Sequence, residues 1–435
     1  MSGPLMAIIL VAGFFLLMAV GTPIGITLMA TALAGMYLFG GPLFAWSMLQ
    51  SFPYSESSSY GFVVVPMFLL MGTVAARTAI VAELYDAAFR WFSAIRGSVF
   101  IATAVTSTGF AALSGSTVVN AAVFTRISLP EMIRLGFDKR FGAGCIAAAG
   151  TIAALIPPSL VMVIYGTVTD TSIGALLLAG IVPGILTGAV YCAGIMLISK
   201  LRPAMSPDTG QRFSLREKLA SLKGIWPLAV LVFVLLYGIY HGIMPPTAAG
   251  GVGAIGTIVL GFARRKLTLH VLWESLVETA RMTAALFLVV LGGLMFARML
   301  LITGLIDYIL RLIEASGVSP FGFIMILVVF YALLGMLVDS ISMMVMTLPF
   351  VFPLVTALGY DAIWFGIVVV KLAELGTITP PVGINLFAVV AAADGEVTLG
   401  DVVRGIWPFI LMELSVLALL IAVPAISLVF MPASH

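Results

Sequence analysis

The chain has 435 residues, of which 62% are hydrophobic and only 9% are charged, and its formal net charge is +2. Because a soluble domain carries roughly 25% charged residues, this composition excludes a soluble enzyme and a disordered protein. The chain also lacks the basic tract that a nucleic-acid partner requires. Cys145 and Cys192 lie in apolar runs, where we expect two small buried side chains and no disulfide framework.

Apolar segments of membrane-spanning length recur from end to end, since about 20 apolar residues cross a bilayer as a helix. No Lys or Arg precedes the first segment, so we expect a retained span rather than a signal peptide. Amphipathic segments are expected at 79–95 and 305–315. The predicted unbroken spans are 4–20, 24–42, 61–77, 173–198, 225–241, 246–263, 281–303 and 405–430.

Four other apolar segments are interrupted. The segments 98–125 and 321–353 are broken at Ser114-Gly115-Ser116 and near Asp339-Ser340, and we interpret both as re-entrant helical hairpins. Proline lacks the amide donor that a helix needs. We therefore interpret 141–168, with Pro157-Pro158, and 361–393, with Pro380-Pro381, as broken spans. With the unbroken spans, these give ten crossings.

The two halves share these landmarks at an offset of about 225 residues, which indicates an internal repeat. We predict one repeat over 1–198 and a second over 224–435, joined by the linker 199–223. An odd number of crossings separates equivalent points, so the repeats have opposite orientations, as in many secondary transporters. The fold class is an all-α polytopic membrane protein with two inverted repeats, each holding a hairpin and a Pro-Pro-broken helix.

Basic residues set the predicted orientation, because cytoplasmic loops are enriched in Lys and Arg. The linker 199–223 holds six of them, which places it in the cytoplasm and both chain ends outside. Of the 21 basic residues, only three are then not placed on the cytoplasmic side: Arg298, Arg311 and Lys371.

Polar side chains gather at the breaks. Hydroxyl and amide oxygens of Ser114, Ser116, Thr117 and Asn120 can bind Na⁺, although small residues also serve helix packing. Asp339 lies between apolar runs, where an ionisable group indicates function, with a structural ion pair as the alternative. Lys371 and Glu374 lie three residues apart and can pair with each other, so we leave them out of the site.

The chain contains no Walker A motif, no His-Glu-x-x-His pair and no Gly-x-Ser-x-Gly elbow. Transport would therefore be driven by an ion gradient rather than by ATP hydrolysis. We expect neither an enzyme nor a resident cofactor, with Na⁺ as the coupling ion.

With these motifs in order along nearly its whole length, the chain resembles the large membrane subunit of tripartite ATP-independent periplasmic (TRAP) transporters. The most specific pieces are Leu155-Ile156-Pro157-Pro158-Ser159, Thr171-Ser172-Ile173, Ala179-Gly180-Ile181-Val182-Pro183-Gly184 and the segment from Gly376 to Phe387. The resemblance implies a sodium-driven elevator transporter in the bacterial inner membrane. It also implies a small membrane subunit, a periplasmic substrate-binding protein, surrounding lipid and a small organic acid substrate.

The resemblance further implies where ligands bind. The first Na⁺ site would involve Ser114, Ser116, Asn120, Thr151, Ile156 and Pro157. The second would involve Asp339, Ser340, Gly376, Thr377 and Pro380. Candidate substrate residues are Ser159, Ser172, Asn385 and Arg298, the last of which can equally meet lipid headgroups. The chain departs from the family pattern at Asn120, often Asp, at Ala248, often Glu, and at Ala153, often Gly.

Two other functional hypotheses are consistent with the same sequence features. A stand-alone ion-coupled carboxylate transporter could have similar inverted hairpins and need no binding protein. A membrane scaffold or enzyme without transport predicts no functional need for Asp339 or for the serines of the first hairpin.

Overall fold

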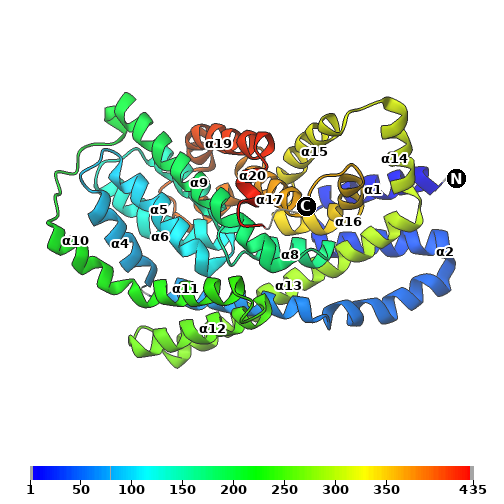
Figure 1. Cartoon of the computed structure of the whole chain (residues 1–435), viewed down its shortest axis with the longest axis horizontal. Helices are drawn as coiled ribbons and strands as arrows, with labels where there is room; N and C mark the ends of the chain where they lie inside the picture. Colours follow the sequence, from blue (N-terminus) through cyan, green and yellow to red (C-terminus); the bar gives the residue numbers. More distant parts are fainter. Residues whose placement is uncertain (1–2, 79, 432–435) are drawn as a thin grey trace.

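The computed structural model describes residues 3–78 and 80–431, and every regular element in these ranges is a helix (Figure 1). The first residue of the expected amphipathic segment 79–95 lies outside them. The first half contains α1 (Gly3–Ala19), α2 (Ile24–Ser57), η1 (Tyr60–Val63), α3 (Val64–Arg77), α4 (Ile80–Phe92), α5 (Ser98–Ser114), α6 (Thr117–Arg134), α7 (Lys139–Thr151), η2 (Ile152–Ala154), α8 (Leu160–Thr169) and α9 (Ile173–Leu201).

The second half follows a similar order of elements. It contains η3 (Pro203–Met205), α10 (Leu215–Ser221), η4 (Leu222–Gly224), α11 (Trp226–Tyr240), α12 (Pro246–Ala263), α13 (Leu269–Ile302), α14 (Leu305–Ser316), α15 (Pro320–Gly335), α16 (Ser340–Ala357), α17 (Ala362–Ile378), α18 (Ile384–Ala392), α19 (Leu399–Ala422) and α20 (Ala425–Leu428).

Within the described ranges, seven helices are long and apolar enough to cross a membrane, or eight if the bent pair α10–α11 forms one span. This confirms the predicted all-helical polytopic membrane protein. The ten crossings and the opposite orientation of the halves stay predictions, since helix lengths alone do not fix them. Both cysteines are free; Cys145 is buried and Cys192 is half-buried.

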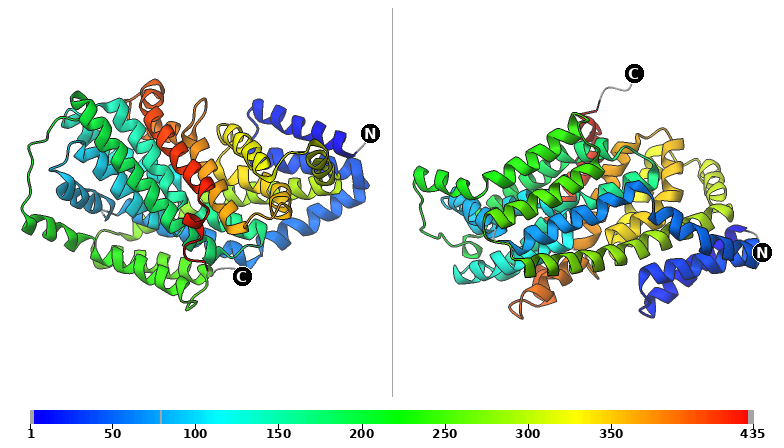
Figure 2. Two further views of the ribbon diagram at one scale, coloured as in Figure 1. Left: turned by 45° about the horizontal axis from the view of Figure 1, so that its top comes forward. Right: turned by 90° about the horizontal axis from the view of Figure 1, so that it is seen from below.

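Some helices do not end where the predicted spans end. Helix α13 begins at Leu269, after the Thr268 cap, and so extends beyond the predicted span 281–303; Glu274 and Glu278 on the added turns pair with Arg77 of α3. Helix α2 continues past residue 42 to Ser57, interrupted only at Gly41, whose φ of 78° is left-handed. The last span ends at Ala422 rather than 430. These two long helices, α2 and α13, lie side by side (Figure 2).

The two predicted hairpins are present as helix pairs. Helices α5 and α6 join through Gly115, whose φ of 54° suits glycine, and Ser116, and the pair extends to Arg134 rather than ending at 125. Helices α15 and α16 join through residues 336–339. Each pair therefore turns at the polar break that the sequence indicated.

Both predicted helix breaks are also confirmed. Helix α7 passes through η2 and ends before α8 begins at Leu160, and α17 ends six residues before α18 begins at Ile384. Each break contains a cis peptide bond, Pro157–Pro158 and Pro380–Pro381. The prolines leave these stretches without helical donors.

Backbone contacts hold the hairpins against the breaks. A Cβ at Gly115 would lie 2.8 Å from the Pro158 carbonyl oxygen, so only glycine lets the first tip approach the first break. A Cβ at Gly376 would lie 2.5 Å from the backbone of Gly335, where α15 crosses the end of α17. The first unwound stretch is therefore covered by protein apart from the half-buried Ile156, as membrane depth requires, whereas the second remains exposed at Pro381.

A cluster of buried charges ties α17 to α9 and α19. Lys371 Nζ donates to Glu374 Oε2 and to Thr187 Oγ1, both at 3.0 Å, and it also pairs with Glu413. The Tyr191 hydroxyl donates to the other Glu413 oxygen. The Lys371, Glu374 and Glu413 side chains are fully buried. The Lys371–Glu374 pair is thus confirmed, and Glu413 is a partner that the sequence did not indicate.

Removing the ammonium should destabilise the fold strongly, because two buried carboxylates would lose their shared cation. We expect Lys371→Met to lower the free energy of unfolding by about 3–5 kcal/mol, measured on purified protein in detergent. The matched control is Arg134→Met, which breaks an exposed pair with Glu131 and should cost less than about 1 kcal/mol. Equal losses in the two variants would contradict the account.

The predicted orientation can be tested by cysteine labelling in a variant with both native cysteines replaced. Ser57 and Arg212 are exposed, at the end of α2 and in the 199–223 linker. A membrane-impermeant thiol reagent should modify Ser57→Cys in intact spheroplasts and Arg212→Cys only after permeabilisation. Modification of both from one side would overturn the orientation.

Candidate functional site

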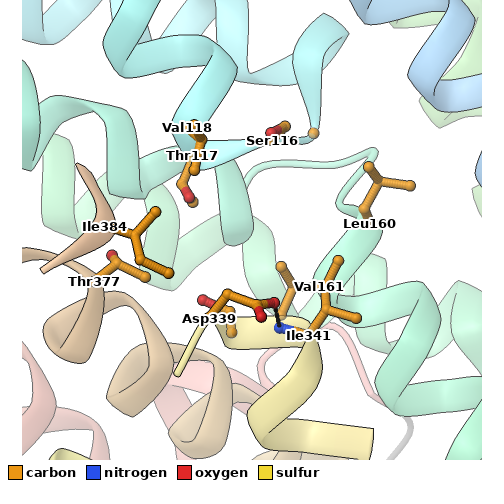
Figure 3. Close-up of a pocket in the computed structure, with 11 residues that line it drawn as sticks. Ser116, Thr117, Val118, Leu160, Val161, Asp339, Ile341, Thr377 and Ile384 are labelled. Carbon is orange, nitrogen blue, oxygen red and sulfur yellow. Dashed lines mark hydrogen bonds between the residues drawn. The ribbon is translucent and has the colours of Figure 1, made fainter. Parts of the chain in front are cut away.

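A cavity of about 90 Å³ lies where the two hairpin tips meet the starts of α8 and α18 (Figure 3). Elements from both halves of the chain therefore form one site. The lining residues are Gly115, Ser116, Thr117, Val118, Leu160, Val161, Asp339, Ser340, Ile341, Thr377 and Ile384.

Four helices begin at this cavity. Ser116, Ser159 and Asp339 cap the first turns of α6, α8 and α16 by accepting backbone N–H donors. Helix α18 starts after Gly383, whose φ of 60° is left-handed and which provides no side-chain cap. The first turn of a helix exposes free N–H groups and carries a partial positive charge. Four such ends around one cavity favour an anionic ligand group.

Asp339 brings a negative charge to the same cavity. Its Oδ1 accepts from the backbone N–H of Ile341 at 3.1 Å and of Ser342 at 3.0 Å, and Oδ2 accepts from the Ser342 hydroxyl. The side chain is half-buried and has no ion-pair partner within the described part of the chain. A cation beside this carboxylate would lower its repulsion of an anionic ligand.

The residues predicted for the first Na⁺ site lie around the first tip and break. Ser114 ends α5, is 2% exposed, and its hydroxyl has no hydrogen-bond partner among the described residues. The Thr151 hydroxyl donates to the Ala148 carbonyl at 2.7 Å. Ile156 and Pro157 lie in the break itself. Burying a hydroxyl without a hydrogen-bond partner destabilises the fold, so Ser114 is a good candidate to bind a ligand at this break.

Asn120 is placed differently from the other predicted ligands. It is fully buried, its Oδ1 lies 3.0 Å from the Ser107 hydroxyl, and its Nδ2 donates to the Ser107 carbonyl oxygen at 3.3 Å. The same Ser107 hydroxyl lies 2.8 Å from the Ala149 carbonyl oxygen on α7. Asn120 therefore links the two arms of the hairpin, which gives the neutral amide a packing role.

The second predicted Na⁺ site repeats this pattern. Ser340 is 7% exposed, and its hydroxyl has no partner in residues 3–78 and 80–431. Gly376 and Thr377 are buried at the end of α17, and Pro380 is half-buried in the break. The Thr377 hydroxyl donates to the Glu374 carbonyl at 2.7 Å. Thr377, near the end of α17, therefore shares the cavity lining with Asp339 and Ser340 of the second tip.

These donors suit a hard cation. The side chains and backbone at both breaks offer hydroxyl, carbonyl and carboxylate oxygens, which sodium-like ions prefer over nitrogen or sulfur. Three or more His, Cys, Asp or Glu side chains do not gather into a metal-binding group anywhere in the described ranges.

The four candidate substrate residues separate into two pairs. Ser159 caps α8 at the cavity, and Asn385 follows the cavity residue Ile384, is fully buried and leaves Oδ1 without a partner in the part of the chain described. Ser172 is exposed and caps α9, while the Arg298 guanidinium stacks 5.4 Å from the Phe52 ring centre. None of the four lines the cavity, but Ser159 and Asn385 each adjoin a residue that does.

Several lining residues were not predicted. Leu160, Ile341 and Ile384 are ordinary apolar residues in the sequence, but each stands at the start of a helix. Their backbone position, rather than their side-chain chemistry, brings them to the site. A Ser or Asp cap precedes two of these starts, at Ser159 and Asp339, and this was the signal that could have found them.

Comparisons with known proteins agree with this architecture. Residues 11–426 match the family "Tripartite ATP-independent periplasmic transporter, DctM component". A C4-dicarboxylate TRAP transporter large permease protein of Pseudomonas aeruginosa is 35% identical over 379 residues, 86% of this chain and 87% of that protein. A sialic acid TRAP transporter large permease protein of Vibrio cholerae is 29% identical and covers 96% of each chain.

Solved structures share the fold at low sequence identity. The YdaH transporter of Alcanivorax borkumensis matches with a TM-score of 0.58 and 15% identity, covering 98% of this chain and all of that chain. MtrF of Neisseria gonorrhoeae also has a TM-score of 0.58, at 12% identity over 86% of this chain and 83% of that chain. On the family match and the close relatives, this inner-membrane protein belongs to the large permease subunits of TRAP transporters.

Proposed function

We propose that this chain imports a carboxylate-bearing organic solute by Na⁺ symport, as the permease subunit of a three-part transporter. The observation that carries the proposal is the cavity where four helix N-termini meet Asp339. A carboxylate group on the substrate would accept hydrogen bonds from the free N–H groups of these first turns. The relatives named for C4-dicarboxylate and sialic acid support an acidic substrate.

Sodium coupling follows from charge in this cavity. An anionic substrate and the Asp339 carboxylate repel each other in a low-dielectric site. A Na⁺ ion bound by Asp339, Ser340 and the backbone from Gly376 to Pro380 would remove that repulsion. Each ligand would then raise the affinity of the other by the same factor. Ser114, with its unpartnered hydroxyl, supports a second Na⁺ site at the first break.

The movement we propose is an elevator. The hairpins α5–α6 and α15–α16 and the broken helices α7–α8 and α17–α18 would move as one unit, held together by the tip-to-break contacts at Gly115 and Gly376. The long helices α2 and α13, together with α3 and α12, would form the scaffold. In this proposal the repeats 1–198 and 224–435 are inverted, with the linker 199–223 between them.

The partners would be a small membrane subunit against the scaffold and a periplasmic binding protein that delivers the substrate. Purification of the tagged chain from its native membrane in mild detergent, followed by mass spectrometry, tests this. Recovery of a small helical membrane protein with the chain is expected. Recovery of the chain alone, folded and able to transport, would favour the stand-alone transporter instead.

Neutralising Asp339 should abolish Na⁺-driven uptake without unfolding the protein. Asp339→Asn keeps an effective helix cap but removes the charge, and we expect uptake in proteoliposomes with the partner proteins to fall to the level seen without Na⁺; Asp339→Ala should do the same. The matched control is Asp361→Asn, because Asp361 caps α17 with the same pair of N–H contacts outside the cavity. Normal Na⁺-driven uptake by Asp339→Asn would refute its role.

Loss of either unpartnered hydroxyl should weaken Na⁺ binding. Ser114→Ala and Ser340→Ala should each raise the Na⁺ concentration for half-maximal uptake by about tenfold, since a bond to a charged group contributes roughly 1.5–3 kcal/mol. Ser128→Ala is the control, because that buried hydroxyl donates to the Phe124 carbonyl within its own helix. An unchanged Na⁺ dependence in both hairpin variants would remove these serines from the ion sites.

A further inference from the structure

A second cavity, of about 380 Å³, shares no lining residue with the first one, although both cavities involve the hairpin α15–α16. It is lined by residues of α1, α13 and α14 and by both helices of the hairpin α15–α16. Its floor consists of deeply buried apolar side chains, Phe296, Leu300, Leu334 and Met346. None of these residues belongs to the proposed ion or substrate sites.

The cavity has almost no polar side-chain atoms that could bind water. Only two of its lining residues, Tyr308 and Thr347, carry a polar atom on the side chain. The Thr347 hydroxyl is already bonded to the Met343 carbonyl at 2.7 Å and to the Tyr331 hydroxyl at 2.8 Å. Tyr308 is 40% exposed at the rim. A buried water needs two to four polar partners, so water does not fill this space.

An empty space of this size would also be unfavourable. Protein interiors are close-packed, and side chains that line a void lose dispersion contacts on one face. We therefore expect an apolar molecule or segment from outside this chain to occupy the cavity.

The mouth of the cavity shows where such an occupant comes from. Ile8, Leu312 and Phe330, at 54%, 51% and 38% exposed, surround it from three different helices. In a membrane-spanning protein these exposed apolar residues face bilayer hydrocarbon. The cavity is thus a recess in the lipid-facing surface, open to acyl chains without any polar barrier.

Helix α14 carries charged residues as well as residues that line the recess. Its apolar residues Leu305, Ile309 and Leu312 line the cavity, while Asp307 and Arg311 are exposed. Arg311 is one of the three basic residues that the orientation rule left outside. An Arg guanidinium pairs well with a phosphate group. A phospholipid could therefore place its headgroup near Arg311 and one chain in the recess.

We propose that this recess binds one acyl chain of a membrane phospholipid. The bound chain would contact the scaffold side through α1, α13 and α14 and the second hairpin through α15 and α16. Hairpin movement would change the shape of the recess, so the lipid would stabilise the hairpin position seen in the structure. The binding itself does not depend on Na⁺ coupling or on the substrate.

Photolabelling of the full-length chain tests the proposal. Vesicles of phosphatidylethanolamine and phosphatidylglycerol would carry a trace of phosphatidylglycerol with a diazirine in the middle of one acyl chain. After illumination, mass spectrometry should find adducts on the floor residues Leu300 and Met346, as well as on Phe233, which is 63% exposed on α11. Adducts on Phe233 without any on the floor would overturn the proposal.

Variants that fill the recess separate binding from random labelling. Leu334→Trp should abolish the floor adducts and leave those on Phe233 unchanged, and Ile309→Trp provides a second filling variant from the α14 side if the first does not fold. Val329→Trp, on the exposed side of α15, is the matched control and should label like the unmodified chain. Floor adducts that persist in both folded filling variants would contradict an acyl-chain site.

The same measurement distinguishes a protein occupant. The complex purified from its native membrane, with whatever membrane partner accompanies the chain, would be labelled in the same vesicles. Floor adducts in the complex are expected. Floor adducts in the isolated chain that disappear in the complex would assign the recess to a partner helix and refute the lipid.

Discussion

A backbone that unwinds inside a bilayer must find its hydrogen-bond partners within the protein, because lipid offers none. The two Pro-Pro pairs create such unwound stretches, and one of the two hairpins packs beside each of them. Gly115 lets the first hairpin tip rest on the Pro158 carbonyl, and Gly376 lets α17 meet Gly335 of the second hairpin. The same breaks give α8 and α18 free N-termini, which turn an unfavourable backbone into a ligand site.

The buried Lys371 cluster and the cavity residue Asp339 differ in how their charges are compensated. Lys371, Glu374 and Glu413 are fully buried, and Lys371 pairs with both carboxylates, which joins α17 to α19. Hydrogen bonds to Thr187 and Tyr191 add α9 to the cluster. Such a cluster specifies one arrangement of α9, α17 and α19, and it costs most when a single partner is lost. Asp339, in contrast, is half-buried at the edge of a cavity, accepts hydrogen bonds from Ile341 and Ser342, and has no ion-pair partner among the described residues. That difference separates a structural charge from one available to a mobile ion.

Local signals in the sequence predicted the breaks, the hairpin tips and the Lys371–Glu374 pair, because proline chemistry, polar interruptions and i,i+3 spacing act over a few residues. Glu413 was missed, since its contact with Lys371 depends on how α19 packs against α17. The early start of α13 was missed because its first turns are too polar to read as membrane span, although Glu274 and Glu278 there pair with Arg77 of another helix. Ser172 was assigned to the substrate by resemblance, and Arg298 was left open between substrate and lipid headgroups; neither lines the cavity, and their substrate roles stay predictions.

The central claim is that the cavity between the hairpin tips holds Na⁺ beside an anionic group. Electron cryomicroscopy of the purified complex, in sodium chloride and in choline chloride, tests it most directly. The account predicts density within ligand distance of Asp339, Ser340 and the 376–380 backbone in sodium, and its loss in choline. Identical maps in both salts, or a sodium-dependent density elsewhere in the protein with this cavity unchanged, would contradict the account.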